Sequence, residues 1–264
     1  MLSEFDISGR TVIITGAARG IGRGIVDVLA EAGANVMVTA LTDRYLKPLQ
    51  ERMASRGLAI DILVADATDS ADWQRTIDAA LNNWGHIDVL INNLGDAIEG
   101  YLVPPPGSDD KATLTEEEWR TVVDINLTEA FLGCQAIADH FVSRRAGKII
   151  NISGYAARKG NPGFLAYSTA KAGVVHLTQT LAQEWAEYGI TVNCIGPGSF
   201  PDPELATPEE MSQRQALAKK NVPLGRVGDP REVGLLTAYL ISDAANYITG
   251  ETIYIDGGAT FKPA

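Results

Sequence analysis

The stretch TVIITGAARGIG, residues 11–22, runs from five apolar or β-branched residues directly into three glycines. Val, Ile and Thr favour strands, and a run without polar alternation is typical of a strand that is buried on both faces of a parallel sheet. Gly16 permits a tight turn at the end of the strand, and the apolar residues after Gly20 have helical spacing. The stretch therefore predicts a strand, a glycine loop and a helix, which is the first half of a βαβ unit.

The glycine loop has the spacing GxxxGxG. Gly20 removes a side chain where the backbone would have to approach a pyrophosphate, and Gly22 lets the helix pack closely on the sheet. The helix N-terminus then offers free N–H groups and the positive end of its dipole to a phosphate. We therefore expect Gly16, Arg19, Gly20, Ile21 and Gly22 to contact a bound dinucleotide.

Strand and helix patterns alternate along the rest of the chain. Strands are expected at 11–15, 35–40, 60–65, 89–92, 148–153, 191–195 and 252–256, and helices at 21–32, 44–55, 72–83, 115–144, 166–188, 208–220 and 230–242. Thr115, with Glu118 three residues later, is typical of a capping box. Residues 1–264 contain no linker or repeat and are interpreted as one domain. The alternation predicts an α/β fold: a Rossmann-type, doubly wound sheet of seven parallel strands flanked by helices.

Composition excludes several classes of protein. The 264 residues carry 33 acidic and 22 basic side chains, a formal charge of −11, which argues against a nucleic-acid surface. No apolar run approaches the ~18 residues of a membrane span, so no membrane partner is expected. Cys134 and Cys194 fit no disulfide framework, and reduced thiols in a cytoplasmic protein are expected. His86, His140 and His176 share no metal-ligand spacing, so no metal site is predicted.

The end of the second predicted strand bears on which dinucleotide is bound. An Asp or Glu at this strand end usually holds a free ribose 2′-hydroxyl. Ala40 and Leu41 occupy that place here, and the first acidic residue is Asp43. Arg19, together with Arg44, could face a 2′-phosphate instead. NADP(H) is therefore favoured, NAD(H) is the alternative, and Leu41 is expected at the cofactor.

Tyr167 and Lys171 are four residues apart in a helical stretch, which places both on one helix face. An ammonium near a phenol favours the phenolate and lowers the tyrosine pKa from ~10 toward the working range. Such a tyrosine can donate a proton to a carbonyl or accept one from an alcohol. The YxxxK spacing is common on its own, so further landmarks are needed.

Five further landmarks stand in order along the chain: Asp66 after the third strand, Asn92-Asn93-Leu94-Gly95 after the fourth, Asn126, Pro197-Gly198 after the sixth, and the closing segment 248–258. Together with the glycine loop and the Tyr167–Lys171 pair, they make seven ordered landmarks. In this pattern the chain resembles the classical short-chain dehydrogenase/reductase family over essentially its whole length. The nearest similarity is to the 3-oxoacyl-carrier-protein-reductase-like branch.

The resemblance implies an oxidoreductase that interconverts a small-molecule carbonyl and a secondary alcohol by hydride transfer. Tyr167 would be the general acid/base. Lys171 would lower the pKa of Tyr167 and bind the nicotinamide ribose. Asn126 would hold a water molecule that links Lys171 to bulk solvent.

The resemblance also implies further cofactor contacts. Asp66 and the backbone of Ala67 would contact the adenine, and Asn93 would lie beside the adenine-side ribose, near Gly95. Pro197, Gly198 and the backbone near Phe200 would flank the nicotinamide. Members of the family commonly form tetramers through the two long helices, here 115–144 and 166–188, so a homo-oligomer (a tetramer or dimer) is expected.

The chain departs from the family at the catalytic serine. That serine normally lies thirteen positions before the tyrosine, and the position here is Gly154. Ser153 is one residue early, and a one-residue shift at a strand end turns a side chain to the opposite face. Either local distortion brings Ser153 into the site as a catalytic residue, or the hydroxyl is absent. In the second case Tyr167, alone or with Tyr155, polarises the substrate carbonyl.

Two long loops, at about 96–112 and 197–221, are expected to shape the substrate pocket because both follow strand ends. In the second loop, Pro201-Asp202 fall near the place of a threonine that touches the nicotinamide carboxamide in the family. An acyl-carrier partner would favour a basic patch near the entrance. The candidates for such a patch are Arg144, Arg145, Arg158 and Lys159, provided that they converge in space.

Two other classes of function stay open beside the oxidoreductase. Because Gly154 occupies the usual position of the catalytic serine, the chain could instead be a nucleotide-binding protein of the same fold with weak or no catalysis, such as a redox-sensing or regulatory module. The presence of Asn126, Tyr167 and Lys171 together speaks against that class. A lyase or epimerase on the same scaffold has no specific residue in its favour.

Overall fold

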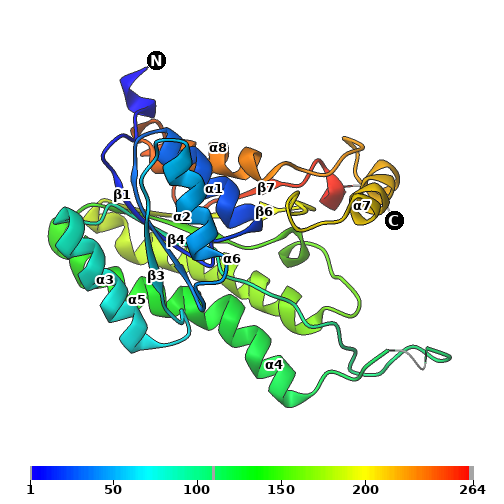
Figure 1. The fold of residues 1–264 in the computed structure, drawn as a ribbon. Coiled ribbons are helices and arrows are strands. Elements are labelled where there is room, and N and C mark those ends of the chain that lie inside the picture. Colours follow the sequence, from blue (N-terminus) through cyan, green and yellow to red (C-terminus); the bar gives the residue numbers. More distant parts are fainter. Residues whose placement is uncertain (1, 109–110, 262–264) are drawn as a thin grey trace.

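One parallel sheet organises the protein, whose computed structural model describes residues 2–108 and 111–261. Its seven strands lie in the order β3-β2-β1-β4-β5-β6-β7, and every neighbouring pair is parallel (Figure 1). The strands are β1 Thr11–Thr15, β2 Asn35–Ala40, β3 Asp61–Val64, β4 Val89–Asn92, β5 Gly147–Ile152, β6 Ile190–Pro197 and β7 Thr252–Ile255. The predicted fold class and strand number are confirmed.

Helices cover both faces of the sheet (Figure 1). One face is packed by α1 Gly20–Glu31, α2 Leu46–Ser55 and α8 Pro230–Ile241, and the other by α3 Ser70–Trp84, α4 Glu116–Val123, α5 Glu129–Arg144 and α6 Leu165–Trp185. Helix α7, Pro208–Asn221, lies apart from both layers, near the segment that follows β7. Along β1, Val12 and Ile14 belong to the first core and Ile13 to the second, all fully buried. This explains the unbroken apolar run in that strand.

The strand order reverses between β1 and β4, which start the two halves of the sheet. In open α/β sheets, ligands bind outside the carboxyl ends of the strands at this switch point. The glycine loop follows β1 there, and the Asn92–Gly95 segment follows β4. The topology therefore brings two of the sequence landmarks to one edge.

The helix expected at 115–144 is not continuous, which corrects the prediction. Helix α4 ends at Val123, a π-helical turn spans Asp124–Thr128, and α5 begins at Glu129. Asn126 lies within the turn, and its Nδ2 donates to the carbonyl oxygens of Val122, at 2.8 Å, and Asp96, at 2.7 Å. Such turns are frequent at functional sites and aim a side chain differently from a regular helix. The capping box at Thr115 is present as predicted.

The two predicted substrate loops differ in structure. The first, 96–112, is anchored by the Gly100 N–H, which donates to the Gly163 carbonyl at 2.8 Å, and its residues 109–110 lie outside the described residues. The second consists of the segment after β6 and helix α7. Within the described part of the chain, no helix combines the length and apolar composition that crossing a membrane requires.

Candidate functional site

A cavity of about 520 Å³ opens at the carboxyl edge of the sheet. This volume lies within the range of small-molecule and cofactor sites. One end is formed by the glycine loop and the end of β2, and the other by α6 and the residues after β4 and β5. Its described lining is Gly16, Ala18, Arg19, Gly20, Ile21, Gly22, Ala40, Leu41, Thr42, Tyr45, Asn93, Leu94, Gly95, Ile152, Ser153, Tyr167, Lys171, Phe200, Asp202 and Leu205.

The glycine loop is tied to the β4 loop by polar contacts. Asn93 Nδ2 donates to the carbonyl oxygens of Thr15, at 2.9 Å, and Gly16, at 3.2 Å. Thr15 Oγ1 in turn accepts the N–H groups of Asn93, at 3.0 Å, and Leu94, at 3.2 Å. A Cβ at Gly22 would lie 2.5 Å from Ala17 Cα, so close helix packing requires glycine there. Asn93 thus braces the loop as well as lining the cavity.

Two arginines gather at the end of β2. The guanidinium groups of Arg19 and Arg44 lie 5.7 Å and 5.1 Å from the centre of the Tyr45 ring, which is within cation–π range. Asp43, the first acid after β2, pairs with Lys47 at 2.5 Å. Arg19 lines this end of the cavity, Arg44 lies nearby at the same Tyr45 ring, and the Asp43 carboxylate is already paired, a charge pattern that suits an added phosphate.

Asp202 occupies the N-terminus of α1. Its Oδ2 accepts the Gly20 N–H at 2.7 Å, and its Oδ1 pairs with Arg23 Nη2 at 2.8 Å. Burial opposes ionisation of this carboxyl, but hydrogen bonds from Glu204 N–H, Gly20 N–H and Arg23 outweigh it and lower the pKa. Glu204 also pairs with Arg23. A carboxylate thus lies at the helix end that favours phosphate.

Lys171 lies at the other end of the cavity and is 2% exposed. Its Nζ donates to the carbonyl oxygens of Ile152, at 2.9 Å, and Leu94, at 3.4 Å. The same Nζ lies 5.9 Å from the centre of the Tyr167 ring. The helical spacing therefore places Tyr167 and Lys171 together in the cavity.

Asn126 and Gly95 lie beside Lys171. Asn126 is fully buried, and its Oδ1 has no hydrogen-bond partner among the described residues. An atom at the Cβ position of residue 95 would lie 2.7 Å from Asn126 Oδ1 and 2.8 Å from Lys171 Nζ. A side chain at residue 95 would therefore clash with both groups, so glycine is required for Asn126 Oδ1 and Lys171 Nζ to lie this close to the segment after β4.

The pKa of Tyr167 runs against the expected direction. We expected Lys171 to lower it, but burial raises it to about 12, and the charges of Tyr155 and Asp96 add to the effect. Burial also lowers the pKa of Lys171, which the nearby Glu129 carboxylate partly offsets. Desolvation is therefore the largest influence on this pKa, and Tyr167 is a neutral phenol at physiological pH.

The structure separates the roles of residues 153 and 154. The Ser153 hydroxyl donates to the Lys171 carbonyl oxygen at 2.8 Å and is buried. A Cβ at Gly154 would lie 3.2 Å from Tyr167 Oη. The extended backbone of Gly154, with φ 179°, is one that any residue adopts. The direction toward the tyrosine hydroxyl therefore belongs to position 154, and the Ser153 proton is engaged by the backbone.

Other predicted cofactor contacts lie outside this cavity's described lining. Asp66 Oδ1 accepts the Thr68 N–H at 2.8 Å, and the Ala67 carbonyl accepts Trp73 Nε1 at 2.8 Å, so both residues close the turn after β3. Pro197 and Gly198 are not among the lining residues either, whereas Phe200 is. Contacts of Asp66, Ala67, Pro197 and Gly198 with a cofactor stay predictions.

Sequence reasoning missed several lining residues, above all Tyr45 and Asp202. Tyr45 carried no signal because its two arginine neighbours meet it only in three dimensions. Asp202 carried a weak signal, since it falls where the family has threonine. The other residues not predicted as contacts are Ala18, Ala40, Thr42, Leu94, Ile152 and Leu205.

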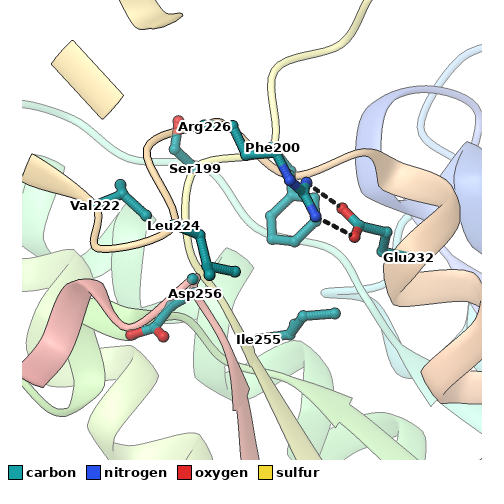
Figure 2. A pocket seen from close by; sticks show the side chains of 10 residues that line it. Ser199, Phe200, Val222, Leu224, Arg226, Glu232, Ile255 and Asp256 are labelled. Carbon is teal, nitrogen blue, oxygen red and sulfur yellow. Dashed lines mark hydrogen bonds and ion pairs between the residues drawn. The ribbon is translucent and has the colours of Figure 1, made fainter. Parts of the chain in front are cut away.

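A small cavity, of about 70 Å³, lies between the loop after β6, the segment after α7 and the end of β7. Figure 2 shows the side chains that line it. The Arg226 guanidinium makes two bonds to the Glu232 carboxylate there, at 2.7 and 2.8 Å, and holds the pKa of Glu232 down to about 2. Phe200 lines both this cavity and the large one, so its position links the two cavities.

Comparison with known proteins agrees with this geometry. A family profile described as enoyl-(acyl carrier protein) reductase matches residues 16–260. A 3-oxoacyl-(acyl-carrier-protein) reductase of Vibrio harveyi is 34% identical over 253 residues, 96% of this chain and 98% of that protein. The chain belongs to the short-chain dehydrogenase/reductase family. Within the family it falls in the 3-oxoacyl-carrier-protein-reductase-like branch, as the sequence indicated.

Other short-chain dehydrogenase/reductase members match as fully. The 3β-hydroxysteroid dehydrogenase 1 of Eggerthella lenta is 36% identical over 260 residues, 98% of this chain and 96% of that protein. A solved short-chain type dehydrogenase/reductase from Mycobacterium marinum is 33% identical, covers 99% of both chains and has a TM-score of 0.86. Short-chain dehydrogenase/reductases are oxidoreductases that act on CH–OH groups and generally use NAD(P)(H).

Substituting Asp202→Asn is expected to tighten binding of NADPH about tenfold, because it removes a like charge and a charge-assisted bond at the phosphate-binding helix end. Isothermal titration calorimetry on the purified protein measures the change. Glu204→Gln is the matched control, since Glu204 also pairs with Arg23 but its side chain is 57% exposed. Unchanged or weaker binding to Asp202→Asn would show that the carboxylate does not compete with the dinucleotide.

Proposed function

We propose that the protein is an NADP(H)-dependent oxidoreductase that interconverts a carbonyl and a secondary alcohol, with Tyr167 as its general acid/base. One observation carries the proposal. A single cavity joins a glycine loop and helix N-terminus, suited to phosphate, to Tyr167 and the buried Lys171. Phosphate recognition and a proton donor are the two protein functions that nicotinamide-dependent carbonyl reduction needs.

The residues of this cavity fit a nicotinamide dinucleotide. Gly20 and Ile21 would face the pyrophosphate, and Arg19 would face a 2′-phosphate. Lys171 and Tyr167 lie at the far end, where the nicotinamide ribose would be held. When bound, the dinucleotide supplies the hydride. The Arg19–Tyr45–Arg44 cluster and the absence of a free acid at the described end of β2 support NADP(H) over NAD(H).

Tyr167 holds its proton at neutral pH because burial raises its pKa to about 12. It is therefore suited to donate a hydrogen bond and then the proton to a substrate carbonyl oxygen. The Lys171 ammonium would stabilise the negative charge of the phenolate that this proton transfer leaves on Tyr167. Asn126 Oδ1 is buried without a hydrogen-bond partner among the described residues, so a water molecule bound to it would continue the path from Lys171 toward solvent.

The site differs from the family pattern in its carbonyl-polarising donors. We assign Ser153 to position the Lys171 backbone, since its proton is given to the Lys171 carbonyl oxygen. Gly154 contributes no donor, so Tyr167 would polarise the carbonyl without a serine. Losing one such donor can cost about 3 kcal/mol of transition-state stabilisation. Turnover is therefore expected to be slow relative to a site that carries both hydroxyls.

The first test follows oxidation of NADPH, and then NADH, by the purified protein with 3-oxoacyl thioesters, 3-oxosteroids, simple ketones and aldehydes. The first two classes follow from the names of the relatives above: 3-oxoacyl thioesters from the 3-oxoacyl reductase, and 3-oxosteroids as the oxidised form of a 3β-hydroxysteroid. Tyr167→Phe is expected to lower kcat/KM at least a hundredfold with NADPH binding retained, because the proton donor is removed. Tyr247→Phe is the control, since Tyr247 is fully exposed and lies outside the described lining of the cavity, and it is expected to retain full activity.

Equal losses in the two variants would contradict the role of Tyr167. Higher affinity for NADH than for NADPH would overturn the cofactor preference. Bound NADPH with no turnover across the whole panel would contradict the proposed reaction.

Substituting Gly154→Ser is expected to preserve turnover and raise kcat/KM by about tenfold or more over Gly154→Ala. Both variants introduce the Cβ that lies 3.2 Å from Tyr167 Oη, but only serine adds a donor toward the carbonyl. Steady-state kinetics on the best substrate of the panel make the comparison. Complete loss of activity in Gly154→Ser would indicate that the site is built around the glycine.

A further inference from the structure

A second cavity, of about 400 Å³, lies between the segment after β5, the start of the loop after β6 and helix α7. Its described lining is Tyr155, Lys159, Gly160, Asn161, Gly198, Ser199, Arg214, Leu217, Ala218, Asn221, Val222 and Ala259. One of the sequence landmarks lines this cavity, because Gly198 belongs to the Pro-Gly pair, and Tyr155 directly follows Gly154. The role proposed for the first cavity, dinucleotide binding, assigns no function to this second cavity.

The second cavity adjoins the reacting end of the first. Tyr155 lines it, and the residue before it, Gly154, points its open Cβ direction at Tyr167 Oη, 3.2 Å away. On the opposite wall, Ser199 lines the second cavity and its neighbour Phe200 lines the first. A substrate whose carbonyl lay at Tyr167 would therefore extend past Tyr155 and Ser199 into this space.

The charged side chains that line the second cavity are both cationic. Lys159 comes from the segment after β5 and Arg214 from α7, and the described lining contains no Asp or Glu. This departs from the whole chain, in which 33 acidic residues outnumber 22 basic ones. A local excess of positive charge in a recess attracts anions more strongly than the same charges on a flat surface.

The acids near these cations are engaged elsewhere. Glu210, one turn before Arg214 on α7, accepts the Thr207 N–H at 2.8 Å in the helix capping box. Asp256, which packs against Gly198, accepts the N–H groups of Gly258, at 2.8 Å, and Thr260, at 2.9 Å. No ion pair of Lys159 or Arg214 is found within the described residues. Arg214 interacts with Glu210 through its charge alone, which helps to lower the Glu210 pKa, so neither cation is held in a salt bridge by a described residue.

The basic residues considered for a carrier-protein patch do not converge. Arg144 pairs with Asp88 at 3.0 Å, and Arg145 lies against the Tyr188 ring. Arg158 lies over the Tyr254 and Phe261 rings, 5.1 and 4.4 Å from their centres. Of these four candidates, Lys159 alone belongs to the described lining of the second cavity. The basic residues nearest to Tyr167 therefore line a cavity that is large enough for a small molecule, and they do not form the patch expected for a carrier protein.

We propose that the substrate of this enzyme carries a carboxylate away from its reacting carbonyl, and that Lys159 and Arg214 bind this carboxylate in the second cavity. The proposal rests on the oxidoreductase function proposed above. The Arg214 guanidinium has the fork geometry that matches a carboxylate, and Lys159 adds a second charge. Leu217, Ala218 and Val222 give an apolar wall for the carbon chain between the two ends.

The test compares straight-chain methyl ketones that end in a carboxylate with the matching methyl amides, over a series of chain lengths. Wild-type protein is expected to show a higher kcat/KM for the acid of the best length than for its amide. Lys159→Gln and Arg214→Gln are each expected to lower the acid-to-amide ratio about tenfold, with the amide values little changed. Raising the ionic strength is expected to reduce the same ratio in the wild type.

Lys219→Gln is the matched control. Lys219 is exposed, as Lys159 and Arg214 are, and lies on the same helix as Arg214 but outside the described lining of the cavity, so its loss removes the same charge without removing a cavity contact. A ratio that falls equally in Lys219→Gln would show that only the general field of α7 matters and would overturn the proposal. A wild-type ratio at or below unity, or one unchanged in both cavity variants, would overturn it as well.

A calorimetric titration separates this proposal from the oxidoreductase function. The same carboxylates are titrated into wild-type protein and into the Lys159→Gln/Arg214→Gln double variant, with NADPH present. If neither acids nor amides are turned over, acid binding that is lost in the double variant still supports the anion site, while the proposed reaction fails. Acid binding that is absent from the wild type, or equal in the two proteins, rejects the anion site.

Discussion

The burial of the Lys171 ammonium is the constraint on which the rest of the site depends. A lysine with 2% exposure loses its hydration, and an unpartnered ammonium in such surroundings would be strongly destabilising. Its partners are the carbonyl oxygens of Ile152, the last residue of β5, and Leu94, which lies two residues after β4. The sheet edge, and not the helix that carries Lys171, therefore determines where the ammonium lies.

The same contacts join the two ends of the cavity. Leu94, whose carbonyl accepts Lys171 Nζ, donates its N–H to Thr15 Oγ1 at the start of the glycine loop. Thr15 Oγ1 also donates to the buried Glu129 carboxylate at 3.4 Å, and burial raises the pKa of Glu129. Glu129 lies directly after the π-helical turn that carries Asn126. A displacement of the glycine loop would therefore change the positions of the groups around Lys171.

The architecture could be read from the sequence because local and non-local signals agreed. Apolar runs without alternation gave all seven strands, with ends within one or two residues of those in the structure. The glycine loop and the Tyr167–Lys171 pair were recognisable because both are short spacings on regular elements, and in the structure they line one cavity. The capping box at Thr115 is similarly local.

The remaining features depend on contacts that sequence spacing does not encode. The π-helical turn arises because Asn126 takes up the carbonyls of Val122 and Asp96, and the latter belongs to a distant loop. Asp202 meets Gly20 and Arg23 across more than a hundred residues, with separations of 182 and 179. The expected lowering of the Tyr167 pKa failed because the balance of burial against charge depends on the whole surrounding packing.

The most direct test of the account is the transfer of isotope from cofactor to product. NADPH that carries deuterium at the reactive face of its nicotinamide is incubated with the best ketone and wild-type protein, and the alcohol is analysed by mass spectrometry. The account predicts one deuterium on the carbinol carbon of the wild-type product, and a product yield that falls at least a hundredfold with Tyr167→Phe. Alcohol formed without the label, or label transfer that is unaffected by Tyr167→Phe, would contradict hydride transfer with Tyr167 as the proton donor.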